Sequence, residues 1–374
     1  MVSAGDAFRL ERMWGLDRRG GAPIGPSTRF DLASLTKPLA TVPLVMNAVA
    51  RRIISLNDSL AHFFGEAVPI EKRGITVRHL LNHSSGLAPY RQFFRELVNI
   101  SPEDRREAVV AMILNDPLDN APGSTAAYSD LGYILLGAIL ERTFGDRLDR
   151  LAREIVFAPP APTRDSNAGQ AGNVGQAFQP AIAFNELHFC PLRTEVGPDV
   201  IPDRVPDLPE AGIQYAAAEF CPWRKRLLVG EVSDENAWSL DGVAGHAGLF
   251  GTVHGVFAMV CLLRDIYLGR LSHSLFTQEI ARLFWTRTGV PEGSTWALGF
   301  DTPRLLESSA GKYFPQNSVG HLGFTGTSFW LDPDRDVLVV LLANRVHPSR
   351  ENDSFKKFRP VVHDLVMEAL ENAI

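Results

Sequence analysis

Residues 30–41 read FDLASLTKPLAT, and this stretch decides how the chain is interpreted. Apolar residues recur at helical spacing from Ser34 to about Ile54, which predicts a buried helix. Proline fits only the first turn of a helix, so Pro38 places the helix start at Ser34. Lys37 then lies one turn away on the same face. Two interpretations stay open here: Ser34 caps the helix and Lys37 is a solvated charge, or the pair is a nucleophile and its activator.

The composition sets the class of protein around this helix. The chain has 374 residues, 45% of them hydrophobic and 21% charged, as in globular proteins with a large core. One large domain and two interlocked domains both fit this length, since cores seldom grow beyond roughly 250–300 residues. The net charge of −6, with no basic block, argues against nucleic acid or an anionic membrane surface as a partner.

No stretch has the length and apolarity of a membrane span, and the N-terminal residues do not read as a signal peptide. We therefore expect a cytoplasmic protein, although a leader removed before this start would leave no trace in the sequence. The cysteines Cys190, Cys221 and Cys261 show no metal-ligand spacing. Free thiols are expected, with a disulfide between Cys190 and Cys221 as the less favoured alternative.

The order of patterns predicts an α+β fold. Helical patterns occupy residues 76–87, 101–114, 128–145 and 146–157, and residues 158–216 form a long irregular stretch rich in Pro, Gly, Asn and Gln. A loop leading into a helix is expected in residues 245–269, then two strands around the turn 332–335 and an amphipathic C-terminal helix. We expect an antiparallel sheet flanked by N- and C-terminal helices, with an inserted helical lobe. The predicted domains are residues 1–60 with 240–374, and residues 61–239.

Two later segments favour the catalytic interpretation of SLTK. YSD at 128–130 enters an apolar helix, and HLG at 321–323 opens the strand-like run GFTGTSFW. In order and spacing, SLTK, YSD and HLG resemble the serine β-lactamase and penicillin-binding-protein group, whose signature is S-x-x-K, then S-x-N or Y-x-N, then K-T-G. The segments HLLNHSSGL and GHAGLFGT also resemble that family, and the tyrosine points to its class C β-lactamase, DD-peptidase and esterase branch.

The resemblance implies a role for each matching residue. Ser34 would be the acylated nucleophile and Lys37 its activator. Tyr128 would be the general base or a proton shuttle, which requires a stabilised phenolate or a relay through Lys37. The backbone N–H groups of Ser34 and Phe324 would form the oxyanion hole. A tyrosine merely packed under a loop is the alternative for Tyr128.

Substrate binding would fall to Asp130, His321 and Gly323. His321 stands where the lactamases carry lysine and would offer a donor, or a cation when protonated, to a substrate carboxylate. Gly323 would let the substrate backbone lie close to the strand. Asp130 replaces the usual asparagine and would pair with Lys37 or a cationic substrate group. Leu322 replaces the usual threonine, and both changes weaken recognition of a β-lactam more than acylation.

Several other polar residues have a structural explanation. His83 and His246 lie in family-like stretches, where a histidine that fixes a loop is the favoured interpretation. Residues 234–236 (DEN) read as a capped turn lining the cleft, since no histidine lies nearby to complete a metal site. His188 with Cys190 falls short of a zinc site. No metal or cofactor is expected.

The start of the chain departs from the family pattern. About 33 residues precede Ser34, where the family usually has a helix and two strands, and residues 5–19 resemble only the end of that hairpin. We expect the sheet to lack an edge strand, or the natural start to lie upstream.

The function predicted is that of a serine hydrolase acting through an acyl-enzyme on Ser34. Its substrates would be small esters, amides, D-amino-acid peptides or β-lactams, with β-lactams secondary. The alternative is a catalytically silent member that uses the fold as a binding or regulatory module. The sequence makes no prediction about oligomeric state.

Overall fold

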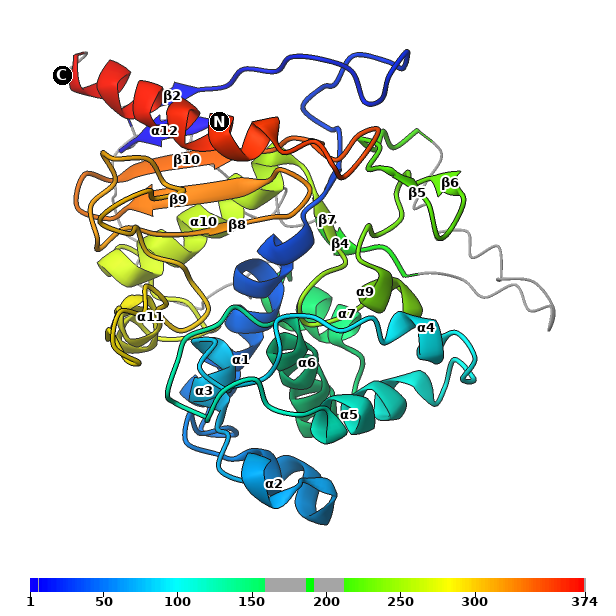
Figure 1. Ribbon diagram of the computed structural model, residues 1–374. Coiled ribbons are helices and arrows are strands. Elements are labelled where there is room, and N and C mark those ends of the chain that lie inside the picture. The colour runs from blue at the N-terminus through cyan, green and yellow to red at the C-terminus, as the bar shows by residue number, and fades with distance from the viewer. Residues whose placement is uncertain (6, 159–185, 192–211, 373–374) are drawn as a thin grey trace, which may run out of the picture.

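A five-stranded antiparallel sheet forms one end of the protein in the computed structural model, which describes residues 1–5, 7–158, 186–191 and 212–372. Its strand order is β2-β1-β10-β9-β8, so strands from the two ends of the chain lie side by side (Figure 1). The bounds are β1 Val2–Ala4, β2 Phe8–Leu10, β8 Val319–Leu322, β9 Ser328–Asp332 and β10 Val337–Leu341. The expectation that an edge strand is missing is wrong, because β1 pairs with β10 and β2 forms the edge.

The strand β10 is apolar along its length because both faces of the sheet are covered. Side chains alternate between the faces of a strand, so Val337 packs in a cluster with α12 (Ser354–Glu371). Leu338 points the other way, into the main core, where α10 (Val253–Leu268) contacts β10. The predicted α+β class with an antiparallel sheet is confirmed.

The helical segment after Ser34 is buried as predicted, but it is not one α-helix that starts there. A 3-10 turn (Ala33–Leu35) leads into a π-helical turn (Lys37–Thr41) and then into α1 (Val42–Ala50). Pro38 has no N–H to donate, so the regular backbone bond cannot form at that residue. Ser34 lies inside the 3-10 turn and makes no capping hydrogen bond, which removes the interpretation of this serine as a cap.

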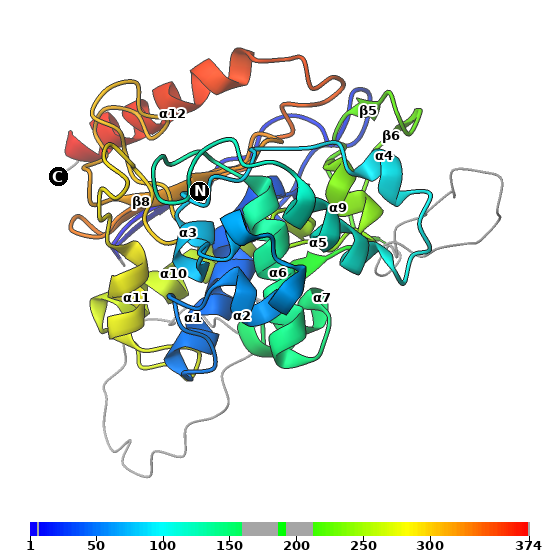
Figure 2. The same ribbon diagram turned by 60° about the horizontal axis from the view of Figure 1, so that its bottom comes forward.

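Helices α2 to α6 lie below the sheet in the view of Figure 1, and Figure 2 shows α2, α5 and α6 from the side that faces away from it. The bounds of the remaining helices are α2 Leu60–Phe64, α3 Val77–Leu81, α4 Phe94–Leu97, α5 Arg105–Asn115, α6 Asp130–Phe144, α7 Leu148–Leu151, α9 Glu235–Ser239 and α11 Gln278–Trp285. Ser129 caps α6 through its hydroxyl oxygen, and Gly145 ends the helix with a φ of +74°, within the predicted range 128–145. The proposed division into two domains stays a prediction.

Two predictions about the secondary structure are wrong. The helix expected from residue 101 begins at Arg105, because the Ser101 hydroxyl donates to the Asp104 carboxylate (2.5 Å) and closes a turn first. The loop expected before α10 contains the strand β7 (Leu249–Gly251). It pairs with β3 (Phe30–Asp31) and with β4, Leu187–Phe189. A two-stranded ribbon of β5, Phe220–Cys221, and β6, Arg226–Leu227, completes the described strands.

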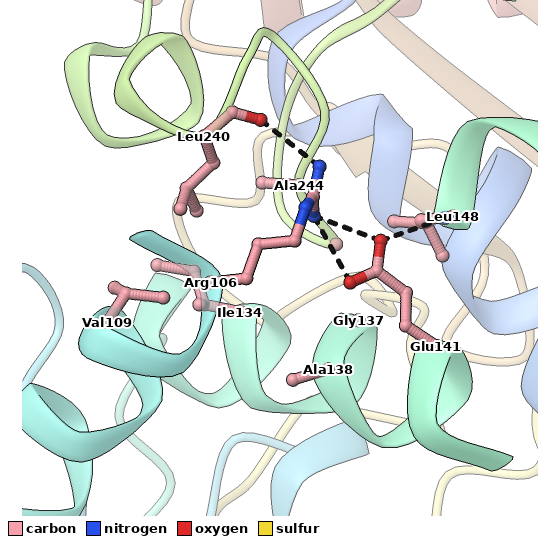
Figure 3. Close-up of a pocket in the computed structure, with 10 residues that line it drawn as sticks. Arg106, Val109, Ile134, Gly137, Ala138, Glu141, Leu148, Leu240 and Ala244 are labelled. Carbon is pink, nitrogen blue, oxygen red and sulfur yellow. Dashed lines mark hydrogen bonds and ion pairs between the residues drawn. The ribbon is translucent and has the colours of Figure 1, made fainter. Parts of the chain in front are cut away.

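An ion pair between α5 and α6 holds the loop at residues 240–246 in place. Arg106 of α5 donates to Glu141 of α6 (2.9 Å) and to the Leu240 carbonyl (3.3 Å), as Figure 3 shows. The loop lies so close to α6 that a Cβ atom on Gly245 would stand 2.1 Å from the Tyr133 carbonyl oxygen. This packing fixes the backbone that leads to His246 in the candidate site.

Candidate active site

The turn that carries Ser34 is held in a strained conformation by a buried carboxylate. Ala33, directly before Ser34, has a φ of +48°, in the region that residues with a side chain rarely adopt. Asp31 accepts hydrogen bonds from the N–H groups of Ala33 (2.9 Å) and Ser233 (2.7 Å). Thr36 adds a bond from its hydroxyl to the Ala33 carbonyl (2.6 Å). These bonds lock the turn and tie it to the segment at Ser233, which lines the cavity beside Ser34.

Two predicted residues, Lys37 and Tyr128, contact the Ser34 hydroxyl. The Lys37 Nζ atom lies 3.2 Å from Ser34 Oγ, and the Tyr128 hydroxyl lies 2.8 Å from it. Lys37 also contacts Asp130 Oδ1 at 2.6 Å and the His246 carbonyl oxygen at 3.2 Å. The pairing of Asp130 with Lys37 is one of the two partners expected for this carboxylate.

The two groups beside Ser34 have shifted acidities. Burial lowers the pKa of the Lys37 ammonium, and the carboxylate of Asp130 acts in the opposite direction. Burial raises the pKa of the Tyr128 phenol well above its ordinary value, and the negative charge of Asp130 raises it further. The phenol is therefore protonated at neutral pH, so of the two possibilities for Tyr128 the geometry favours a relay rather than a standing phenolate.

A buried aromatic group backs Tyr128. The His83 ring lies 4.6 Å from the Tyr128 ring and 4.4 Å from that of Trp296, centroid to centroid. His83 Nδ1 accepts the Ser129 N–H (3.1 Å) and so fixes the loop that carries Tyr128. Trp296 belongs to no motif in the sequence, and only the fold brings it to this group.

His321 does not match the role expected of it. It is 2% exposed, and its Nδ1 lies 2.8 Å from the Leu322 carbonyl oxygen. Burial, together with the charge of Lys37, lowers the pKa of His321 to about 3. The imidazole is neutral at physiological pH, which disfavours the expected cation for a substrate carboxylate. The prediction that His321 and Leu322 open the following strand is also wrong, because both residues end β8.

Gly323 is required by packing between two backbone segments. A Cβ atom there would stand 2.0 Å from the Thr327 hydroxyl and 2.7 Å from the Leu32 carbonyl oxygen. The expected contact with substrate is not needed to explain this glycine. Phe324, by contrast, is 46% exposed and lines a cavity with Ser34. Neither Phe324 nor Ser34 shows an acceptor for its backbone N–H within the described residues, as an oxyanion hole requires.

The cavity that opens beside Ser34 has a volume of about 590 Å³. Its lining combines carboxylates with aromatic rings. The described lining residues include Ser34, Tyr90, Phe94, Tyr128, Asp130, Glu219, Phe220, Trp223, Asp234, Glu235, His246, Phe324, Arg350 and Glu351. A space of this size suits a small molecule or a short peptide.

The capped turn at residues 234–236 is part of the same wall. Asp234 caps α9, and its Oδ1 lies 2.8 Å from His246 Nε2. Burial alone would raise the pKa of Asp234, but His246 and the hydrogen bonds lower it to about 2. The structure thus gives His246 two contacts, the Asp234 carboxylate and, through its carbonyl, Lys37. Sequence reasoning undervalued this position because the contact with Lys37 is made by the backbone carbonyl of His246, which a side-chain pattern does not show.

The described residues contain neither a metal site nor a disulfide. Among them, no group of three or more His, Cys, Asp and Glu could hold a metal ion. Cys190, Cys221 and Cys261 are free thiols. His188 contacts Cys190 at 3.3 Å without further metal-ligand partners in the described ranges. In the same part of the chain, no helix has the length and apolarity needed to cross a bilayer. The irregular stretch predicted at 158–216 lies largely outside the described residues.

Comparison with known proteins identifies the family. The β-lactamase family model matches residues 1–358, so the chain belongs to the β-lactamase family. It is a hydrolase of the β-lactamase and penicillin-binding-protein superfamily.

Two curated relatives and one solved structure illustrate the likeness. An N-acetylmuramyl-L-alanine amidase of Bacillus subtilis (strain 168) is 28% identical over 345 residues, 88% of this chain and 70% of the relative. A putative D-alanyl-D-alanine carboxypeptidase of Salmonella heidelberg (strain SL476) is 26% identical over 365 residues, 90% of this chain and 76% of the relative. The penicillin binding protein from Bacillus halodurans has a TM-score of 0.65 at 17% identity, covering 100% of this chain and 95% of that one, which shows the fold alone.

Proposed function

We propose that the protein hydrolyses small esters, amides, D-amino-acid peptides or β-lactams through an acyl-enzyme on Ser34. The observation that carries this proposal is the position of Ser34 Oγ, 3.2 Å from Lys37 Nζ and 2.8 Å from the Tyr128 hydroxyl, at the wall of the cavity. A structural serine would need neither partner. A serine nucleophile needs a base within hydrogen-bond reach.

Lys37 is the group best placed to take the Ser34 proton. A neutral amine has two N–H bonds and one lone pair, and Lys37 has three partners that match them. The ammonium form donates to Ser34 Oγ, Asp130 and the His246 carbonyl; in the neutral amine the last two would accept its N–H bonds and the lone pair would face the Ser34 hydroxyl. Burial favours this neutral form by lowering the pKa of Lys37.

The reaction then runs in two halves. Ser34 Oγ bonds to the substrate carbonyl carbon while its proton moves to Lys37, and the resulting oxyanion lies between the N–H groups of Ser34 and Phe324. The bond to the leaving group breaks as Tyr128 donates its proton, which Lys37 replaces. Water then attacks the acyl carbon and gives a proton to Lys37, which passes a proton to Ser34 Oγ as the acyl–oxygen bond breaks; this releases the carboxylic acid and restores Ser34.

The position of the third motif makes β-lactams and other substrates with a free carboxylate the less favoured members of this group. His321 is buried and neutral, and Leu322 packs against the apolar cluster beneath α12. Neither offers the positive charge or hydroxyl that would hold a carboxylate. Esters and amides without a free carboxylate need neither of these groups for binding.

Active-site labelling tests the proposal. The protein is incubated with a fluorophosphonate probe or a fluorescent penicillin, and the adduct is located by peptide mass mapping. We expect an adduct on Ser34, no adduct in Ser34→Ala, and ester or amide turnover reduced by about a thousandfold or more in that variant. An adduct on another residue, or equal turnover by both proteins, would overturn the proposal in favour of another site.

A further inference from the structure

The cavity beside Ser34 carries more negative charge than its own cations balance. Four carboxylates lie on its inner wall: Asp130, Glu219, Asp234 and Glu235. Lys37 is paired with Asp130, and Arg350 is paired with Glu219 and Glu235. Four carboxylates against Lys37 and Arg350 leave an excess of two negative charges among these six side chains, and of three when Lys37 is the neutral base. At the rim, exposed Glu351 and Arg95 cancel each other.

Three of these carboxylates lie near one another on the wall. Contacts of Lys37 with Asp130 and with the His246 carbonyl, and of His246 with Asp234, link Asp130 to Asp234, and Glu235 follows Asp234 in the chain. The charges of Asp234, Glu235 and Asp130 also raise the pKa of the Tyr90 phenol beyond the effect of burial. Glu235 is 8% exposed. Burial raises the pKa of its carboxyl group, and the charge of the neighbouring Asp234 raises it further. Carboxylates held this close repel one another, and a bound cation would relieve that repulsion.

A buried histidine also lines this cavity. His246 is 1% exposed, and its Nδ1 has no hydrogen-bond partner among the described residues. Asp234 takes the proton-bearing Nε2, so in the neutral ring Nδ1 carries a free lone pair. A buried acceptor of this kind is satisfied by a ligand that donates hydrogen bonds.

The guanidinium groups of the cavity do not provide an equivalent site for an anion. Arg350 already donates to the carboxylates of Glu219 and Glu235. Arg95 is exposed, donates to Gln92 (2.7 Å) and lies against the Phe94 ring. A substrate carboxylate would therefore compete with bonds that are already made, and it would approach an excess of like charge.

We infer that the cavity binds the acyl part of its substrate through a protonated primary amine placed among Asp130, Asp234 and Glu235. This inference rests on the proposed function and narrows it to amino-acid amides, esters or peptides with a free amino group. An ammonium matches the site because it has three donors and one positive charge. The aromatic rings that line the rest of the cavity would contact the apolar part of such a substrate.

The test compares alanine p-nitroanilide with its N-acetyl derivative, each in the D and the L form. The two differ in the charge on the amine, and both release the same chromophore. Binding is measured by calorimetry on Ser34→Ala, which cannot form the acyl-enzyme, and turnover on the unaltered protein. We expect the free amine of the preferred enantiomer to bind at least about tenfold more tightly than its acetylated form.

Two charge-removing variants make the test specific. Glu235→Gln removes a charge from the inner wall but keeps an acceptor for Arg350, and should reduce the preference for the free amine several-fold. Glu351→Gln removes the same charge at the exposed rim and should change the preference less than about twofold. Equal binding of the two compounds by Ser34→Ala, or equal effects of the two variants, overturns the inference. Absence of Ser34-dependent turnover together with preferred binding of the amine would instead overturn the proposed function alone.

Discussion

Replacing Asp31 with asparagine tests how the turn at Ser34 is held. Asp31 is 5% exposed, and its two oxygens accept the N–H groups of Ala33 and Ser233. Burial raises the pKa of this carboxyl group from 3.8 to about 6, although both hydrogen bonds act in the opposite direction. The substitution Asp31→Asn would keep the size of the side chain and remove its ionisation.

The sign of the effect follows from proton binding. Between pH 3.8 and about 6 the folded protein keeps a proton on Asp31 that the unfolded chain has lost, so stability falls as the pH rises through this range. The stabilisation is complete below pH 3.8 and absent above about pH 6. A shift of about two pKa units corresponds to about 3 kcal/mol in the free energy of unfolding, of which about 2 kcal/mol falls between pH 4 and 7.5.

Urea unfolding at several pH values provides the measurement. We expect the free energy of unfolding of Asp31→Asn, taken relative to the unaltered protein, to increase by about 2 kcal/mol from pH 4 to pH 7.5. Glu103→Gln serves as the control, because Glu103 is exposed in a surface turn and loses the same charge. If the free energies of unfolding of Asp31→Asn and of the unaltered protein differ by the same amount at every pH in this range, Asp31 is not the buried titrating group that the structure describes.

Two further predictions concern the surroundings of Ser34. His321→Gln should leave the acid limb of kcat/KM between pH 5 and 8 in place, because the pKa of His321 is already lowered to about 3; a shift of that limb would show that the imidazole titrates during turnover. Gly245→Ala should destabilise the fold by about 1–3 kcal/mol and slow the labelling of Ser34, because the new Cβ meets the Tyr133 carbonyl at 2.1 Å. The control Gly74→Ala places its Cβ in open space, and equal melting temperatures for the two variants would contradict the packing argument.

The sequence predicted best those elements whose determining residues lie close together in the chain. Ser129 and Gly145 set the ends of α6 through bonds and backbone angles within a few residues, so the local pattern sufficed. The strand β1 has only three residues, and its pairing partner β10 is more than 300 positions away. A three-residue strand has no period to detect, which explains why only the end of the N-terminal hairpin was predicted.

The residues of the candidate site also fall into those that a local motif identifies and those that only the fold brings together. Ser34 and Lys37 are one turn apart, and the motif at 128–130 completes a pattern that the sequence alone could select. Asp31 was not selected, although it stands in the opening stretch, because its second partner is the backbone of Ser233. The protonation state of His321 was also beyond the sequence, since it depends on burial that the whole fold creates.

The aspartate at position 130 links recognition to chemistry. Burial favours neutral Lys37, which can accept the Ser34 proton, whereas the charges of Asp130 and Asp234 favour the ammonium form, which cannot. An amine bound among these carboxylates would neutralise part of their charge and so lower the pKa of Lys37 further. The substrate would then help to create the neutral Lys37 that takes the proton of Ser34, and an acetylated analogue would not. Asp130 in place of asparagine would thus make the proposed activity of Ser34 depend on the charge of the molecule bound in the cavity.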